Sequence, residues 1–254
     1  MVAVTGVLLI VFVIFHLIGN LQFFFGPKII NEYGTHLRDL PFGLLWVLRI
    51  GLLATVLAHI ITTIILVKEN RAARGTPYAF KASVQAKLAT RLMAVSGILL
   101  LSYIVFHLLH FTTHNINPAF AEWHYVDPES GSTFKHHDVY RMLVYGFSNV
   151  WISVFYIIAM VLLANHLSHG ASSLFQTLGL RTKKLATTLG VGAQIFAWAL
   201  CIGYSSIPLA VMAGAYDKAY IASTEAPAPV APSTPPKTPL GGKVSLNQDG
   251  KGGL

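Results

Sequence analysis

Five long apolar stretches, separated by polar segments, occupy the chain up to about residue 214. A helix needs about 20 mostly apolar residues to cross the hydrocarbon core of a bilayer, and each stretch reaches that length. The pattern therefore predicts an all-α integral membrane bundle of five transmembrane helices. We expect the spans at about Val2–Phe25, Leu44–Val67, Leu92–Phe111, Met142–Leu167 and Leu185–Ala213.

The segment after the last span has a different composition. Residues 215–254 are rich in Pro, Ala and Gly, and the stretch that begins at about Ser223 has too few large apolar side chains to bury a core. We therefore expect one membrane domain, residues 1–214, followed by a disordered tail, residues 215–254.

Overall composition agrees with a bilayer environment. Of the 254 residues, 54% are hydrophobic and 11% are charged, whereas about a quarter of the residues of a soluble domain are charged. The single cysteine, Cys201, cannot form an intramolecular disulfide or supply the several thiolates of an iron–sulfur cluster. The formal charge of +8 comes from basic residues beside the apolar stretches, a distribution that indicates membrane orientation rather than nucleic-acid binding.

Basic residues concentrate in two of the polar segments. The segment between spans two and three has one acid, Glu69, and the segment between spans four and five has none. By the positive-inside rule both segments face the cytoplasm, which places the N-terminus in the cytoplasm and the C-terminus outside. The basic residues are Lys68, Arg71, Arg74, Lys81, Lys87 and Arg91 in the first segment and Arg181, Lys183 and Lys184 in the second.

Four of the five spans contain histidine, which is rare in hydrocarbon and usually functional there. At 1.5 Å per residue, His16 and His107 lie roughly 21 and 22 Å from the cytoplasmic ends of spans one and three, so they share an outer level. His59 lies about 12 Å from the inner end of span two. His166 or His169, at the inner end of span four, shares this inner level, and depth does not separate the two.

Paired histidines at one depth suggest a specific cofactor. A porphyrin iron that is bound from both faces takes two imidazoles from different helices, and helix bundles commonly hold cofactors in this way. The two levels therefore predict two hemes. A weak internal repeat selects His107 over His110, because residues 4–6 (VTG) and 15–17 (FHL) match residues 95–97 (VSG) and 106–108 (FHL) at a constant offset of 91.

At these residues the chain resembles the cytochrome b subunit of the diheme succinate dehydrogenase and fumarate reductase family, the membrane part of complex II-type enzymes. The resemblance covers about residues 1–214. It is carried by FHLIGNLQFF in span one, LAHIITTII in span two, RLMAVSGILLLSYIVFHLLHF in span three and NHLSHGASSLFQTLG at the end of span four.

The resemblance implies that His16 and His107 bind an outer heme b, and that His59 and His166 bind an inner one. It favours His166 because the fourth ligand of the family precedes a glycine by four residues, here Gly170. His169 would then lie beside the heme or its propionates. Some relatives carry a Glu of a proton route two residues before this ligand, where this chain has Ala164, so we do not expect that route.

The resemblance also implies partners and a substrate. Relatives usually work with menaquinone and dock a flavoprotein with covalent FAD and an iron–sulfur protein on the cytoplasmic face. This chain has no dinucleotide fingerprint and no cysteine cluster, so the succinate site and the iron–sulfur clusters belong to those partners. The expected protein is the anchor subunit of a succinate:quinone oxidoreductase in the inner, cytoplasmic membrane of a prokaryote.

Other functions stay open at this point. A quinol:fumarate reductase of the same family would run the reaction in reverse. The diheme subunit of a respiratory nitrate reductase would place histidines mainly on spans two and five, but span five here has none. A proton or metal transporter would gather its histidines at one depth near the midplane.

Several further residues are weaker candidates. Arg49 and Arg91 could each pair with a heme propionate, although snorkelling explains the first and positive-inside orientation the second. Glu32 could accept protons at a quinone site, or it could simply balance Lys28. We expect the loop histidines His36, His114, His124, His136 and His137 to be solvated and Trp46, Trp123 and Tyr125 to form an interface belt.

Overall fold

The computed structural model describes residues 1–73, 93–126, 133–177, 179, 182 and 185–225. Within them, five helices are long and apolar enough to span a bilayer, which confirms the all-α membrane bundle. Spans one and three continue past their α-helices in a 3-10 turn (Gln22–Phe25) and a π-helical turn (Leu108–Thr112). The five helices are α1 (Val2–Leu21), α3 (Leu44–Ala72), α5 (Met93–His107), α7 (Val150–Thr177) and α8 (Ala186–Met212).

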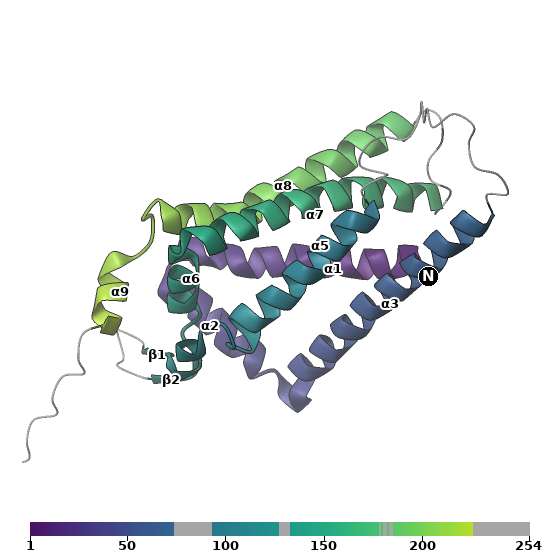
Figure 1. Ribbon diagram of the computed structural model, residues 1–254. Coiled ribbons are helices and arrows are strands. Elements are labelled where there is room, and N and C mark those ends of the chain that lie inside the picture. The colour runs from purple at the N-terminus through teal and green to yellow at the C-terminus, as the bar shows by residue number, and fades with distance from the viewer. Residues whose placement is uncertain (74–92, 127–132, 178, 180–181, 183–184, 226–254) are drawn as a thin grey trace, which may run out of the picture.

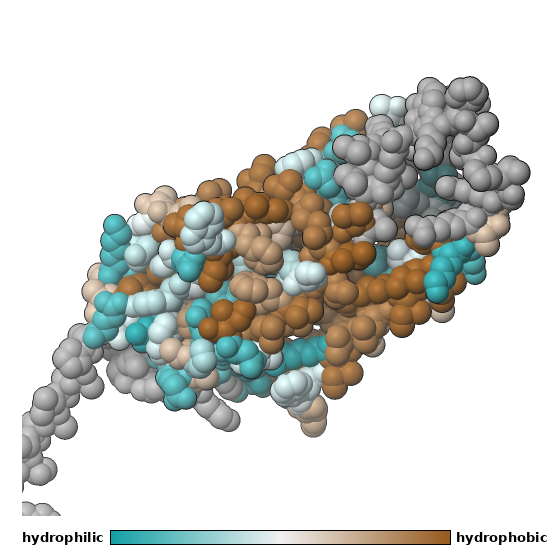
Figure 2. Space-filling model, viewed as in Figure 1, coloured by the Kyte–Doolittle hydropathy of each residue, from teal (hydrophilic) through white to brown (hydrophobic). Residues whose placement is uncertain are grey.

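The spans alternate in direction and form one bundle (Figure 1). α7 and α8 lie side by side, and α1 and α5 both pack against α7. α3 contacts chiefly α1. No residue in the most apolar window of α3 is buried within the protein, and apolar side chains cover the visible flanks of the spans (Figure 2). An apolar surface of this extent suits lipid rather than water.

Span four begins later than the sequence pattern predicts. The expected span, Met142–Leu167, is divided at Asn149, where α6 (Val139–Ser148) ends and α7 begins. The Asn149 side chain accepts the backbone N–H groups of residues 151 and 152 at 3.0 and 3.3 Å, and such capping favours a new helix start. At its other end α7 continues further than expected, to Thr177. His166 lies well inside it, eleven residues before its last residue, and not at the inner end.

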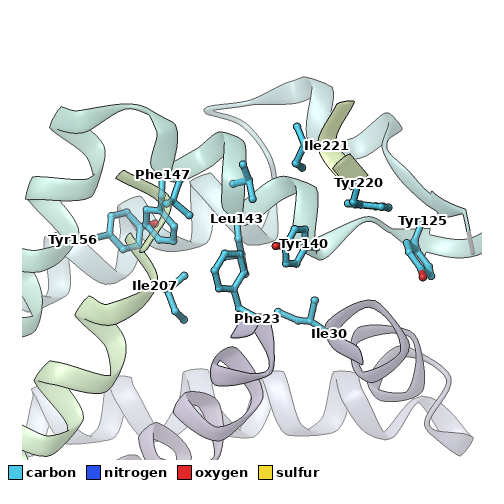
Figure 3. Close-up of a cluster of buried hydrophobic side chains, with 12 residues drawn as sticks. Phe23, Ile30, Tyr125, Tyr140, Leu143, Phe147, Tyr156, Ile207, Tyr220 and Ile221 are labelled. Atoms are coloured by element: carbon cyan, nitrogen blue, oxygen red, sulfur yellow. The ribbon is translucent and has the colours of Figure 1, made fainter. Parts of the chain in front are cut away.

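Shorter elements cover one end of the bundle, at the left in Figure 1, which we call the outer end. α2 (Pro27–Arg38) follows span one, and a two-stranded antiparallel hairpin, β1 (His124–Val126) and β2 (Thr133–His137), follows span three. With α6 and α9 (Lys218–Glu225) they surround a cluster of buried side chains, half of them aromatic (Figure 3). Tyr125, which we expected in an interface belt, is only 1% exposed and belongs to this cluster.

The predicted C-terminal boundary at residue 215 needs correction. α9 lies within the segment that we expected to be disordered, and its Tyr220 and Ile221 are buried against the outer end. The Tyr220 hydroxyl donates to the buried carboxylate of Asp138, and burial beside that charge raises the pKa of Tyr220, so the phenol keeps its proton. The Pro-rich composition begins only at residue 226. Residues 226–254 lie outside the described part of the chain.

Candidate functional site

The outer pair of histidines forms a direct contact between α1 and α5. The ring centroids of His16 and His107 are 5.9 Å apart, and the ring planes are 84° apart. Metal–imidazole bonds are about 2 Å long, so two imidazoles that bind one iron from opposite faces have centroids about 6 Å apart. The observed spacing matches that geometry.

The inner pair is held by two hydroxyl groups. Thr5 Oγ1 on α1 lies 3.0 Å from Nδ1 of His59 on α3, and Ser96 Oγ on α5 lies 3.1 Å from Nδ1 of His166 on α7. His59 and His166 lie close enough to interact electrostatically. Each inner histidine therefore has the same kind of partner, supplied by a helix that also carries an outer histidine.

The hydroxyl groups suit one tautomer of the inner histidines. A hydroxyl has one proton to donate. Thr5 Oγ1 lies 3.0 Å from the carbonyl oxygen of Val2, and Ser96 Oγ lies 3.0 Å from that of Met93. A hydroxyl that donates to such a carbonyl can accept from an imidazole Nδ1–H. In the tautomer with the proton on Nδ1, Nε2 keeps its lone pair, as a metal ligand requires.

The same contacts separate the two pairs by depth. Thr5 marks the level of His59, and it precedes His16 by eleven residues on α1. Ser96 marks the level of His166, and it precedes His107 by eleven residues on α5. Eleven residues of helix correspond to about 16 Å. The structure therefore brings together His16 with His107 and His59 with His166 at two distinct heights.

His110 differs from these four histidines. It is completely buried, with 0% exposure, and both of its ring nitrogens have partners. Nδ1 lies 3.0 Å from the Tyr156 hydroxyl, and Nε2 lies 3.2 Å from the side-chain amide nitrogen of Asn117. An amide N–H₂ group can only donate, so it occupies the Nε2 lone pair of His110. This side chain is a hydrogen-bonded core histidine without a free lone pair for a metal.

Two tyrosines around the outer pair were not anticipated from the sequence. Tyr103 stacks on His107 at 5.9 Å between ring centroids, and Tyr204 of α8 lies 6.1 Å from His16. The Tyr204 hydroxyl donates to the carbonyl of Val13 at 2.7 Å and so joins α8 to α1. These rings cover part of the outer histidines, which are both half-buried. A tyrosine within an apolar span has no special spacing, so the sequence carries no signal for this role.

Positive charge gathers near the outer ends of α2 and α3. The Arg49 guanidinium lies 5.0 Å from the centroid of the Trp46 ring. Burial lowers the pKa of Arg38, and the positive charge of nearby Arg49 lowers it further. Nη1 of Arg38 is buried without a hydrogen-bond partner in the described part of the chain. A buried guanidinium is stable only with an acceptor, so this cluster is suited to an anionic group.

The remaining predicted residues are less informative. Arg91 lies outside the described residues. His169 is near enough to His166 to influence it electrostatically. Glu32 is exposed on α2. The expectation of solvated loop histidines is wrong for His114, which is 7% exposed because its backbone turns at φ 59° and its ring packs against Phe120.

A cavity of about 390 Å³ opens at the outer end of α1. Its lining combines aromatic rings with one carboxylate. Phe23, one of the lining residues, follows His16 by seven residues on the same span, which corresponds to about 10 Å. This cavity is a wide, open hollow rather than an enclosed pocket. The cavity is lined by Phe23, Phe24, Phe25, Gly26, Tyr140, Ala215, Tyr216 and Asp217.

Each histidine pair supplies two possible ligands for a metal. In the described ranges, no group of three or more His, Cys, Asp or Glu side chains is placed to hold a metal ion. A heme iron already has four nitrogen ligands from its macrocycle and needs only two from the protein. Each level of this bundle offers two imidazoles.

Comparisons with protein-family models, curated proteins and solved structures gave no match.

Proposed function

We propose that this chain is a diheme cytochrome b that serves as the membrane anchor of a succinate:quinone oxidoreductase. The observation that carries the proposal is the arrangement of four histidines as two pairs about 16 Å apart in depth, with Nδ1 of each inner histidine 3.0 or 3.1 Å from a hydroxyl. His16 and His107 would hold the outer heme b, and His59 and His166 the inner one. Bound heme would supply one-electron redox chemistry.

The residues of the chain prepare each site. Thr5 and Ser96 can accept from Nδ1–H of the inner histidines and so leave Nε2 free, and Tyr103 and Tyr204 cover part of the outer histidines. Arg38 and Arg49 supply the positive charge that the propionates of the outer heme need. Arg91 and His169 are candidates for the same role near the inner heme.

The proposed electron path runs from partner subunits to quinone. A flavoprotein with FAD and an iron–sulfur protein would dock on the cytoplasmic face and deliver electrons to the inner level. The iron–sulfur clusters would belong to that partner, because this chain has a single cysteine. The aromatic cavity at the outer end suits the ring of a quinone, with menaquinone as the expected substrate. Glu32 stays a candidate proton acceptor, although it does not line that cavity. The membrane would be the inner membrane of a prokaryote.

A difference spectrum of the purified protein, reduced minus oxidised, tests the heme assignment. We expect b-type absorbance and a pyridine hemochrome content of two hemes per chain. Copurification of a flavoprotein and an iron–sulfur protein would support the anchor role, and the direction of the reaction follows from succinate oxidation and fumarate reduction assays on that complex. Absence of b-type absorbance from protein purified after expression with ample heme would refute the proposal and leave a histidine-containing transporter as the alternative.

A further inference from the structure

We infer that Thr5 and Ser96 are positioning residues for the inner heme. Each accepts the Nδ1–H of one inner ligand, fixes the orientation of its ring and lowers the reduction potential of the iron that the ring binds. The inference rests on the proposed function, because it assumes that His59 and His166 bind iron through Nε2.

The geometry is the same on both sides of the inner site. Both hydroxyl-bearing residues are buried, at 8% exposure each, and their distances to Nδ1 agree within 0.1 Å, at 3.0 and 3.1 Å. Thr5 and Ser96 are also equivalent in the internal repeat, 91 residues apart, as are His16 and His107. α1 and α5 therefore each supply one outer ligand and one partner for an inner ligand.

The chemistry follows from the direction of the hydrogen bonds. An imidazole that donates from Nδ1 to an oxygen gains electron density at Nε2 and becomes a stronger ligand. A stronger donor ligand favours the ferric over the ferrous state, which lowers the reduction potential. Each hydroxyl already donates to a backbone carbonyl. Hydrogen bonds in a chain polarise one another, so the hydroxyl oxygen is a better acceptor than an isolated one.

A purely structural role for these hydroxyls predicts a different result. Serine and threonine side chains in helices often bond to a carbonyl one turn earlier without any further function. Thr55 on α3 and Ser102 on α5 do so, to the carbonyls of Gly51 and Ile98 at 2.8 and 3.2 Å. These two residues are matched controls, because they lie on spans of the same bundle and, in the described part of the chain, their hydroxyls bond to a helix carbonyl and not to a histidine.

The experiment compares the two heme potentials in the purified full-length protein. Thr5→Val and Ser96→Ala remove a hydroxyl, Thr5→Ser and Ser96→Thr retain it, and Thr55→Val and Ser102→Ala are the controls. Redox titration by absorbance and the low-spin ferric signals in electron paramagnetic resonance report on each heme. We expect each hydroxyl deletion to favour reduction of the inner heme by up to about tenfold, an upward shift of up to about 59 mV for one electron.

The outer heme serves as an internal reference. Its potential and signal should stay constant, the hydroxyl-retaining variants should behave as the unmodified protein, and the control variants should shift neither heme. Loss of the inner heme alone in Thr5→Val, with retention in Thr5→Ser, would support the same role. Unchanged inner-heme potential and signal in both deletions, or equal shifts in the controls, would overturn the inference while two hemes are still bound. Absence of any b heme from the purified protein would instead refute the proposed function.

Discussion

Histidines that look equivalent in the sequence differ, at the residue scale, in whether a lone pair is available. His107 and His110 are one helical turn apart on span three, and either could be a ligand by depth alone. His107 lies against His16, whereas both nitrogens of His110 have partners, Tyr156 and Asn117. The Tyr156 hydroxyl also lies 3.4 Å from Nδ1 of His107. The two histidines therefore differ at Nε2, which Asn117 contacts only in His110.

Replacing the two histidines separately tests this distinction. We expect His107→Ala to lose the outer heme and His110→Ala to retain both hemes at lower stability. The second change removes the partner of the Asn117 amide and leaves the Tyr156 hydroxyl only its longer contact, 3.4 Å, with Nδ1 of His107, and a buried polar group left unsatisfied costs about 1–3 kcal/mol. Heme content by pyridine hemochrome and the midpoint of thermal unfolding measure the two effects. Loss of the outer heme in His110→Ala, with its retention in His107→Ala, would reverse the assignment.

The four histidines were identifiable from single positions, but their hydrogen-bond partners were not. A histidine in an apolar span is unusual enough to stand out. Thr5 and Ser96 are ordinary residues for a membrane helix, and only the tertiary structure shows that each meets a histidine 54 or 70 residues away. The internal repeat contained both positions, so it was the one available signal.

At the scale of elements, hydropathy located all five spans but misplaced one boundary. The sequence from Met142 to Leu167 is continuously apolar apart from a few small polar residues, so hydropathy alone does not separate α6 from α7. The division depends on the Asn149 side chain, which caps α7, and on the packing of α6 in the outer aromatic cluster. Hydropathy averaged over a window of residues detects neither capping, which is a local effect, nor packing, which is a tertiary one.

The junction of α2, α6 and α9 depends on one buried carboxylate. Asp138 is 1% exposed, and it accepts hydrogen bonds from Asn31 Nδ2 at 2.9 Å, from the backbone N–H of Arg141 at 3.0 Å and from the Tyr220 hydroxyl. Hydrogen bonds to a charged group contribute about 1.5–3 kcal/mol each. α9 has eight residues and would not be a stable helix on its own, so it depends on such contacts.

Asp138→Ala should therefore release α9 from the bundle while the spans stay folded. Without the carboxylate, Tyr220 loses its acceptor and Asn31 loses one partner, so residues 218–225 should exchange backbone amide hydrogens faster by about tenfold or more, as expected for the loss of roughly 1.5–3 kcal/mol. Hydrogen exchange followed by mass spectrometry measures this. Asp138→Asn, which keeps an acceptor oxygen, should give a smaller effect. Equal exchange of α9 in the alanine variant and the unmodified protein would contradict the role of Asp138.

At the scale of the whole molecule, the two histidine levels follow from antiparallel topology. Spans one and three run in one direction and carry their histidines late, whereas spans two and four run in the other direction and carry theirs at the opposite depth. Counting residues along apolar stretches was enough to predict this arrangement. The count placed His166 at the end of its span. Because α7 continues to Thr177, His166 lies deeper than expected and matches the depth of His59 more closely. His59 lies ten residues before Glu69, the end of its span, and His166 lies eleven before Thr177.

The separation of the levels makes a prediction about paired losses. Because about 16 Å of helix lies between the two sites, removing one imidazole should empty its own site and leave the other intact. We expect His16→Ala and His107→Ala to lose the same spectral component, and His59→Ala and His166→Ala to lose the other, each with one heme remaining per chain. Redox-resolved difference spectra with hemochrome quantification identify the component that is lost.

His169→Ala is the control for this series, because His169 lies near the inner site but is not one of the proposed ligands. It should retain two hemes. Retention of the inner heme in His166→Ala, together with its loss in His169→Ala, would show that the fourth ligand is His169, three residues further along the chain. The two-level arrangement would still hold. If His16→Ala and His59→Ala removed the same component, the pairing across α1–α5 and α3–α7 would be wrong, because ligands at two depths cannot bind one iron.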